Sequence, residues 1–187
     1  GAIYCVCLSL RNIDTAMIDN CIISNNSAKS GGGICISEVP VAISNSELRN
    51  NDANDGGAVY NGGNLILKND VLSLNKAGNG AGIYNKRELD INGVAADKNI
   101  ASNYGGMIYN DANLLITLLK SDSNEAYFGG AISNAAKTNI TNSEFSSNKA
   151  SEAGVIYSSS DLIVANSKFN NNQITRKGGV LSLAMGN

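Results

Sequence analysis

Histidine is missing from all 187 residues of this chain. Without imidazole there is no histidine-based catalytic triad, no histidine general base and none of the usual histidine-containing zinc ligand sets. Hydrolysis of a glycoside would instead need two carboxylates on one surface patch, and the acidic residues do not build up such a column. We therefore expect a protein that is not an enzyme and that has no cofactor and no metal.

Proline is scarce as well, since Pro40 is the only one. No linker and no shift in composition divides the sequence, so residues 1–187 are expected to form a single repeat domain. Neither end carries a polar cap of the kind that closes a repeat protein. We expect either a segment of a longer solenoid or a subunit whose uncapped ends stack on other copies.

Long apolar runs and clusters of positive charge are also missing. The longest apolar stretch, residues 114–119, is far shorter than a membrane-spanning helix. The Lys and Arg residues are scattered, and the net charge is −2. Because phosphate binding needs clustered cations, we expect no transmembrane segment and no nucleic-acid partner.

What the sequence does contain is a repeat of 24 or 25 residues, with a longer first interval. Its marker is an aliphatic residue that follows small residues and usually precedes a tyrosine. The markers are Ile3, Ile34, Val59, Ile83, Ile108, Ile132, Ile156 and Leu181. A period in this range is typical of solenoids, in which each unit buries its apolar face against its neighbours.

Each unit also carries two asparagines that flank an apolar residue, as in Asn45, Leu48 and Asn51. Stacked asparagines at a fixed turn can hydrogen-bond along the solenoid, so we interpret them as structural. Two units are irregular. In one, Ala95 holds the apolar place between Asn92 and Asn99, and in another Leu118 and Ser121 replace the first asparagine and the apolar residue.

Glycine doublets follow the second asparagine of most units. We expect them at bends that need a positive φ or a close approach of two backbones. The doublets are Gly31 and Gly32, Gly56 and Gly57, Gly105 and Gly106, Gly129 and Gly130, and Gly178 and Gly179.

Three short apolar runs per unit, separated by Gly and Asn turns, predict three strands per coil and no helix. Strands stacked on their equivalents form parallel sheets, and coils about 4.8 Å apart give a rod of roughly 35 Å. We predict an all-β parallel β-helix. The alternative is a leucine-rich-repeat-like solenoid, which requires leucines three and five residues before its asparagine. Serine or aspartate holds the fifth position instead, at Ser46, Asp70, Ser143 and Ser167.

A column of tyrosines directly follows the markers, at Tyr4, Tyr60, Tyr84, Tyr109 and Tyr157. Neighbouring residues of a strand point to opposite faces, so these rings lie outside if the markers lie in the core. An exposed aromatic ladder can hold sugars or partner proteins, whereas a ladder covered by its own turns only packs. The sequence does not decide between the two.

All four cysteines, Cys5, Cys7, Cys21 and Cys35, lie in the first two units. Cys35 falls one coil from Cys5 and one column away, so a disulfide between stacked coils would suit an oxidising setting. Free buried thiols and a metal site are the alternatives. The sequence does not choose the pairing.

Other candidate sites are weaker. Asp52 and Asp55 could hold calcium or form a solvated turn. Arg87 or Arg176 could face an acidic sugar in a lyase, although neither has an evident partner. The sequons at residues 25–27 and 139–141 carry little weight in so asparagine-rich a chain.

Together these elements resemble the GGA(I, L or V) and FxxN repeats of chlamydial polymorphic membrane proteins, which are autotransporter passengers. Gly56 to Val59 and Gly129 to Ile132 match the first motif, and Phe145 to Asn148 and Phe169 to Asn172 match the second. Similar repeats occur in adhesin-like surface proteins of other microbes. The resemblance implies a right-handed β-helix that is secreted or displayed at the cell surface.

Our leading hypothesis is a non-enzymatic extracellular adhesin or structural module that contacts a host or neighbouring-cell surface protein or glycan. One alternative is a filament or sheath subunit that associates end to end, which concentration-dependent fibres of uniform width would support. Another is a β-helix that binds or cleaves polysaccharides.

Overall fold

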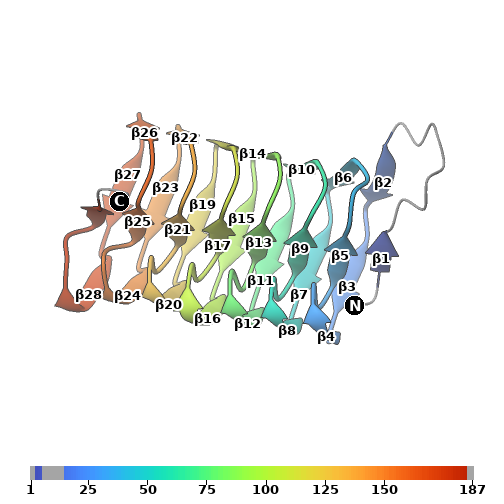
Figure 1. The fold of residues 1–187 in the computed structure, drawn as a ribbon, viewed down its shortest axis with the longest axis horizontal. Helices are drawn as coiled ribbons and strands as arrows, with labels where there is room; N and C mark the ends of the chain where they lie inside the picture. The colour runs from blue at the N-terminus through green and yellow to red at the C-terminus, as the bar shows by residue number, and fades with distance from the viewer. Residues whose placement is uncertain (1–2, 6–14, 185–187) are drawn as a thin grey trace.

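The computed structural model describes residues 15–184 and, as backbone alone, residues 3–5. Within these residues the chain forms strands and no helix, wound into a solenoid of about seven coils (Figure 1). Each strand pairs in parallel with the equivalent strand of the next coil, as in the pairing of Leu65 with Leu89. The arrangement fits a right-handed parallel β-helix and confirms the predicted fold class.

Four parallel sheets run along the solenoid, and we name them A to D in the order in which one coil passes through them. Sheet A contains β1 (Ile3–Cys5), β5 (Ile34–Ile36), β9 (Val59–Asn61), β13 (Ile83–Asn85), β17 (Ile108–Asn110), β21 (Ile132–Asn134), β25 (Ile156–Ser158) and β29 (Leu181–Leu183). Sheet B contains β2 (Ala16–Asp19), β6 (Val41–Ser44), β10 (Leu65–Lys68), β14 (Leu89–Asn92), β18 (Leu114–Thr117), β22 (Thr138–Thr141) and β26 (Leu162–Ala165). Sheet C contains β3 (Ile22–Ser24), β7 (Glu47–Arg49), β11 (Val71–Ser73), β15 (Ala95–Asp97), β19 (Lys120–Asp122), β23 (Glu144–Ser146) and β27 (Lys168–Asn170). Sheet D contains β4 (Ser27–Ser30), β8 (Asp52–Asp55), β12 (Lys76–Asn79), β16 (Ile100–Tyr104), β20 (Glu125–Phe128), β24 (Lys149–Glu152) and β28 (Gln173–Lys177).

The prediction of three strands per coil is wrong, because each full coil has four. Sheet D was not recognised since its strands point small residues inward, except for Ile174 of β28. In β8, for example, buried Ala53 stands between exposed Asp52 and exposed Asn54. The leucine-rich-repeat alternative is also wrong, because that fold has one strand per repeat and lines a horseshoe.

The core lies inside the coils and is built from inward-facing columns. The sheet A markers from Ile34 to Ile156 are fully buried, as are Ile43, Leu67, Ile91, Ile116 and Ile140 of sheet B. Such columns bury apolar side chains against their equivalents one coil away, which is the main driving force for stacking. None of the described residues forms a helix long and apolar enough to cross a membrane.

The two glycines of each doublet have different tasks. The first adopts a positive φ, such as 68° at Gly56, and this conformation favours glycine. Except at Gly179, the second lies against the next coil, so a Cβ at Gly57 would collide with the carbonyl oxygens of Ala81 and Lys76. In the units without a doublet, Gly80 and Ala153 take the positive-φ position, with φ of 57° and 56°.

The second asparagine of each unit forms a buried ladder at the turn from sheet C to sheet D. Its members are Asn26, Asn51, Asn75, Asn99, Asn124, Asn148 and Asn172. Each amide nitrogen up to Asn148 donates to the amide oxygen of the next member, over 2.8–3.2 Å. The interpretation of these residues as structural is confirmed.

One irregular unit is paired differently from the prediction. Ala96, not Ala95, is buried and pairs in register with Leu72. The turn before it is made by Gly93, with a φ of 72°, and not by Asn92. In the other irregular unit Ser121 does hold the core position and donates to the Oδ1 of Asn148 over 3.1 Å.

Candidate functional site

The tyrosine column lies on the outer face of sheet A, opposite the buried markers. Tyr60, Tyr84 and Tyr109 are in register on β9, β13 and β17 and are half-buried. The ring centroids of Tyr60 and Tyr84 are 5.4 Å apart, and those of Tyr84 and Tyr109 are 4.8 Å apart. Stacking in this direction turns ring faces toward one another and leaves ring edges and hydroxyls toward the solvent.

The column breaks after Tyr109, because Ser133 holds the next place in register. Aromatic residues of sheet D fill the gap. Tyr104 lies 6.0 Å from Tyr109 and stacks on Phe128 at 5.2 Å, and Phe128 lies 5.9 Å from Tyr157. Tyr157 is therefore connected to the other tyrosines only through Phe128.

We call this set the aromatic stripe. It consists of Tyr60, Tyr84, Tyr104, Tyr109, Tyr127, Phe128 and Tyr157. The sheet D members were missed in the sequence because they lie outside the marker column. A usable signal existed, since Tyr104 and Phe128 each stand directly before a glycine doublet.

A bulge shapes the middle of the stripe. Strand β16 has one residue more than its neighbour β12, and the register shifts between Ala77 and Asn79. The extra length exposes Tyr104 and borders a shallow hollow of about 300 Å³ lined by Ser102, Asn103, Tyr104, Tyr127 and Phe128. Bulges of this kind re-aim side chains and occur often near binding sites.

Polar groups line the edges of the stripe. The ammonium group of Lys86 lies 5.7 Å from the ring centroid of Tyr84. At the far end the hydroxyl of Tyr127 accepts a hydrogen bond from Arg176 over 3.0 Å and donates to Glu152 over 3.1 Å. Rigid rings with polar rims are suited to recognition of another surface.

Burial is the main cause of a raised pKa in two of the rings. It raises the pKa of Tyr84 to about 12, with smaller contributions from Tyr109 and Asp55. The pKa of Tyr109 is also raised, first by burial and then by Asp111. Both phenols are therefore neutral at physiological pH and present hydroxyl groups that donate and accept hydrogen bonds.

The other candidate residues do not meet at a site. Exposed Asp52 stands between Ser27 and Lys76 in its column, and Asp55 accepts a hydrogen bond from Asn79 over 2.8 Å. No group of possible metal ligands occurs in the residues described. Arg87 lines a separate hollow beside Pro40. Arg176 lies in β28, several coils away from Arg87.

The cysteine predictions remain open. Cys21 is a free, exposed thiol, and half-buried Cys35 is in backbone register with Tyr4. Cys7 and the side chains of Tyr4 and Cys5 lie outside the described residues. The disulfide pairing stays a prediction, as does any role of Tyr4 in the tyrosine column.

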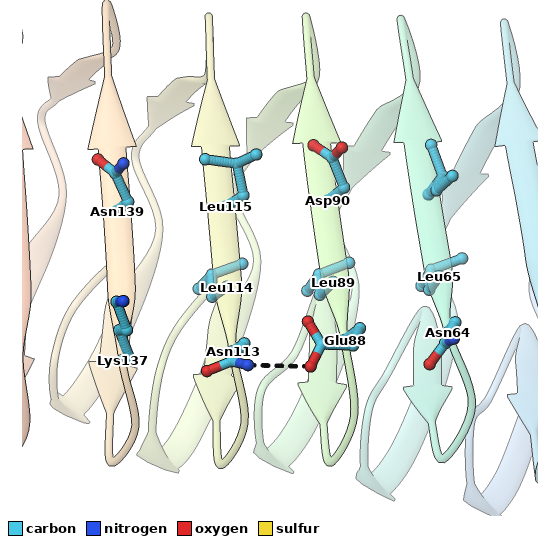
Figure 2. A pocket seen from close by; sticks show the side chains of 11 residues that line it. Asn64, Leu65, Glu88, Leu89, Asp90, Asn113, Leu114, Leu115, Lys137 and Asn139 are labelled. Atoms are coloured by element: carbon cyan, nitrogen blue, oxygen red, sulfur yellow. Dashed lines mark hydrogen bonds between the residues drawn. The ribbon is translucent and has the colours of Figure 1, made fainter.

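A second surface feature lies on the outer face of sheet B and was not predicted. A groove of about 430 Å³ runs across the strands β10, β14, β18 and β22 (Figure 2). One wall is the row Asn64, Glu88, Asn113 and Lys137, and the other is the row Ile66, Asp90, Leu115 and Asn139. The Nδ2 of Asn113 donates to the Oε1 of Glu88 over 2.9 Å.

Comparison with protein-family models gives one match, to the Chlamydia polymorphic membrane protein repeat, over residues 20–37. No curated protein and no solved structure matches the chain. The matched segment contains β3, β4 and β5, and with them Asn26 of the ladder and the glycine doublet at Gly31 and Gly32. Residues 20–37 therefore carry a Chlamydia polymorphic membrane protein repeat, set within a parallel β-solenoid.

Proposed function

We propose that this chain is an adhesin-like, non-enzymatic surface module that binds a host or neighbouring-cell surface protein through its aromatic stripe. The repeat match supports a protein associated with a membrane or cell surface. The aromatic stripe is the observation that carries the binding role, because its stacked rings form one continuous outward surface over several coils.

The geometry favours a protein partner over a sugar stacked on the rings. Both faces of Tyr84 are covered by Tyr60 and Tyr109, so a sugar has no free ring face at the centre of the stripe. Ring edges and neutral hydroxyl groups remain available. Tyrosine used in this way gives a large rigid contact at a small loss of side-chain entropy, as in many protein interfaces.

The test is binding of the labelled protein to a panel of cells, before and after treatment of the cells with protease or glycosidase. We expect protease alone to abolish binding. The pair Tyr84→Ala and Tyr109→Ala should weaken it by at least about tenfold, as expected for central aromatic contacts. The same pair changed to Phe keeps the stack and reports on the hydroxyl groups.

Ile22→Ser, on sheet C, is the matched control because it removes an exposed apolar side chain outside the stripe. Binding that is lost only after glycosidase would transfer the proposal to a glycan partner. The proposal would be contradicted if the protein released products from a polyanionic glycan, or if the tyrosine variants bound cells as strongly as the parent protein.

A further inference from the structure

The outer face of sheet B carries a column that is unusually apolar for an exposed surface. Its members, in register from β2 to β26, are Met17, Ala42, Ile66, Asp90, Leu115, Asn139 and Ile163. Met17, Ile66, Leu115 and Ile163 are 76%, 51%, 43% and 56% exposed. Asp90 and Asn139 interrupt the apolar members, so a partner of this face has to match both apolar and polar groups.

The charges beside this column are asymmetric along the solenoid. Glu88 on the β14 side and Lys137 on the β22 side stand in the same row of the groove, with Asn113 of the intervening coil between them (Figure 2). All three side chains are exposed. Along this row the charge is negative at Glu88, zero at Asn113 beside β18, and positive at Lys137.

We propose that sheet B is the face of a symmetric dimer, in which a second copy of this chain packs face to face about a two-fold axis along β18. Such an axis keeps each row opposite itself and reverses the order of the coils. β14 then faces β22 of the other copy, and β10 faces β26. A two-fold interface pairs residue i with j and j with i, so each complementary contact occurs twice.

Under this operation the opposing side chains are complementary. Glu88 meets Lys137, Asp90 meets the amide of Asn139, and Leu115 meets Leu115 at the axis. Ile66 meets Ile163 at the apolar flank. In the outermost row Asn92 meets Thr141, and none of the described outward residues of sheet B from β10 to β26 meets a residue of like charge.

Other axes do not give this match. An axis along β14 would place Asp90 opposite Asp90 and Glu88 opposite Glu88. An axis along β22 would place Lys137 opposite Lys137. Like charges brought together across an interface weaken association strongly. Of these three axes, only the one along β18 avoids such contacts and places Glu88 opposite Lys137.

The interface is small, so we expect the dimer to be weak. Five strands about 4.8 Å apart and four residues long cover on the order of 300 Å² per copy, below the roughly 800 Å² per partner of a standard interface. We expect association in the micromolar to millimolar range, on the order of a transient complex. The aromatic stripe lies on sheets A and D and stays open in this dimer.

The test is sedimentation equilibrium of the whole chain up to about 1 mM, combined with a charge swap. Glu88→Lys and Lys137→Glu should each weaken the dimer by about tenfold, because each replaces two attractive contacts with two repulsive ones. The double variant restores opposite charges and should return to within about threefold of the parent. Leu115→Asp places two carboxylates at the axis and should abolish the dimer.

Asp122→Lys is the matched control, since it makes the same charge change on exposed sheet C. A zero-length carboxyl-to-amine cross-link between Glu88 of an isotope-labelled copy and Lys137 of an unlabelled copy, found in the dimer band of a mixture of the two, would support the assignment without any variant. A monomer throughout the concentration series would overturn the proposal. The proposal would also be overturned if the single changes left the dissociation constant of the dimer unchanged, or if the folded double variant associated as weakly as the single variants.

Discussion

Asp70 is a buried carboxylate at the turn from sheet B to sheet C, where it is 1% exposed. Its Oδ1 accepts a hydrogen bond from the backbone N–H of Ser46 over 2.8 Å, and its Oδ2 accepts one from the backbone N–H of Lys68 over 2.9 Å. Burial nevertheless outweighs these bonds and raises the pKa of Asp70 to about 6. The folded state thus holds this proton more tightly than the unfolded chain does, whose aspartate pKa is about 3.9.

The raised pKa makes the free energy of unfolding fall as the pH rises from about 4 to about 6, because the folded state binds more protons in this window. Above it, the charged Asp70 destabilises the fold by about 1–3 kcal/mol. Asp70→Ser should therefore raise the free energy of unfolding by about 1 kcal/mol near pH 7.5, and the gain should vanish near pH 4. Urea unfolding at both pH values measures this.

Serine is a suitable replacement because Ser46 and Ser143 hold the same turn position, accept a backbone hydrogen bond from the preceding coil and donate to a carbonyl oxygen two residues earlier. Exposed Asp161→Ser is the control and should show no pH-dependent gain. An Asp70→Ser gain that is equal at both pH values would contradict the role of ionisation.

Leu118 adopts a φ of 56° and is 54% exposed at the turn from sheet B to sheet C. The equivalent residues are Asn20, Asn45, Asn69, Gly93, Asn142 and Asn166, all with positive φ. This left-handed conformation crowds the Cβ of most residues by about 1 kcal/mol or more, whereas asparagine tolerates it. The backbone is therefore strained at Leu118, whereas the asparagine or glycine at the equivalent position of each other coil adopts a similar φ with little strain.

Leu118→Asn should raise the free energy of unfolding by about 1 kcal/mol, by relief of backbone strain. The reverse change at the next coil, Asn142→Leu, should lower it by a similar amount. Thermal and urea unfolding measure both. The idea fails if Leu118→Asn destabilises the protein, since the leucine would then contribute packing that outweighs the strain.

At the scale of the element, the asparagine ladder satisfies turn backbone in every coil. The Nδ2 of Asn99 donates to Leu72 and to Asn124, both over 2.8 Å, and its Oδ1 accepts from the backbone and side chain of Asn75. All of these groups are buried. Removing one rung therefore leaves several buried polar groups without partners.

Asn99→Ala should lower the free energy of unfolding by about 3–4 kcal/mol, because each unsatisfied buried group costs about 1–3 kcal/mol and some groups will recruit water. Exposed Asn92→Ala removes the same side chain outside the ladder and should change it by less than about 0.5 kcal/mol. The urea midpoint, at an unchanged slope, measures both. Equal effects of the two changes would show that the ladder contributes little.

The elements that could be predicted from the sequence are those whose residue type repeats for a local physical reason. The markers, the ladder asparagines and the doublets recur because core volume, buried hydrogen bonds and positive φ each select one kind of residue. Sheet D could not be predicted in this way, because its inward positions are mostly small residues such as Ala53, which give no apolar run in the sequence.

The surface features were harder to predict because they depend on register between coils. In the apolar run Leu65, Ile66 and Leu67, the sequence alone does not tell which side chain faces outward. The strand pairing shows that the side chain of Ile66 faces outward. It also places Ile66 beside Asp90 in one wall of the groove on sheet B. The aromatic stripe likewise depends on Phe128 lying next to Tyr157, which belongs to a different sheet and a later coil.

At the scale of the whole molecule, the solenoid is quasi-one-dimensional, since every strand of it pairs only with strands of neighbouring coils. Stability is then close to a sum of coil terms and interface terms. One complete coil should be removable without loss of the fold, provided that the cut joins equivalent positions. Val41 and Leu65 are such positions because they pair in register.

Deletion of residues 41–64 joins Pro40 to Leu65 and should leave a folded β-solenoid that is one coil shorter. Because about one coil in seven is lost, the urea slope should fall by roughly a seventh, since it scales with the surface exposed on unfolding. Deletion of residues 41–52 removes half a coil, places sheet D strands against sheet B strands and turns core columns outward. That variant should not fold, as measured by circular dichroism and urea unfolding. If both deletions unfold the protein equally, the coils do not act as separable units, and if both fold, register between coils does not specify the structure.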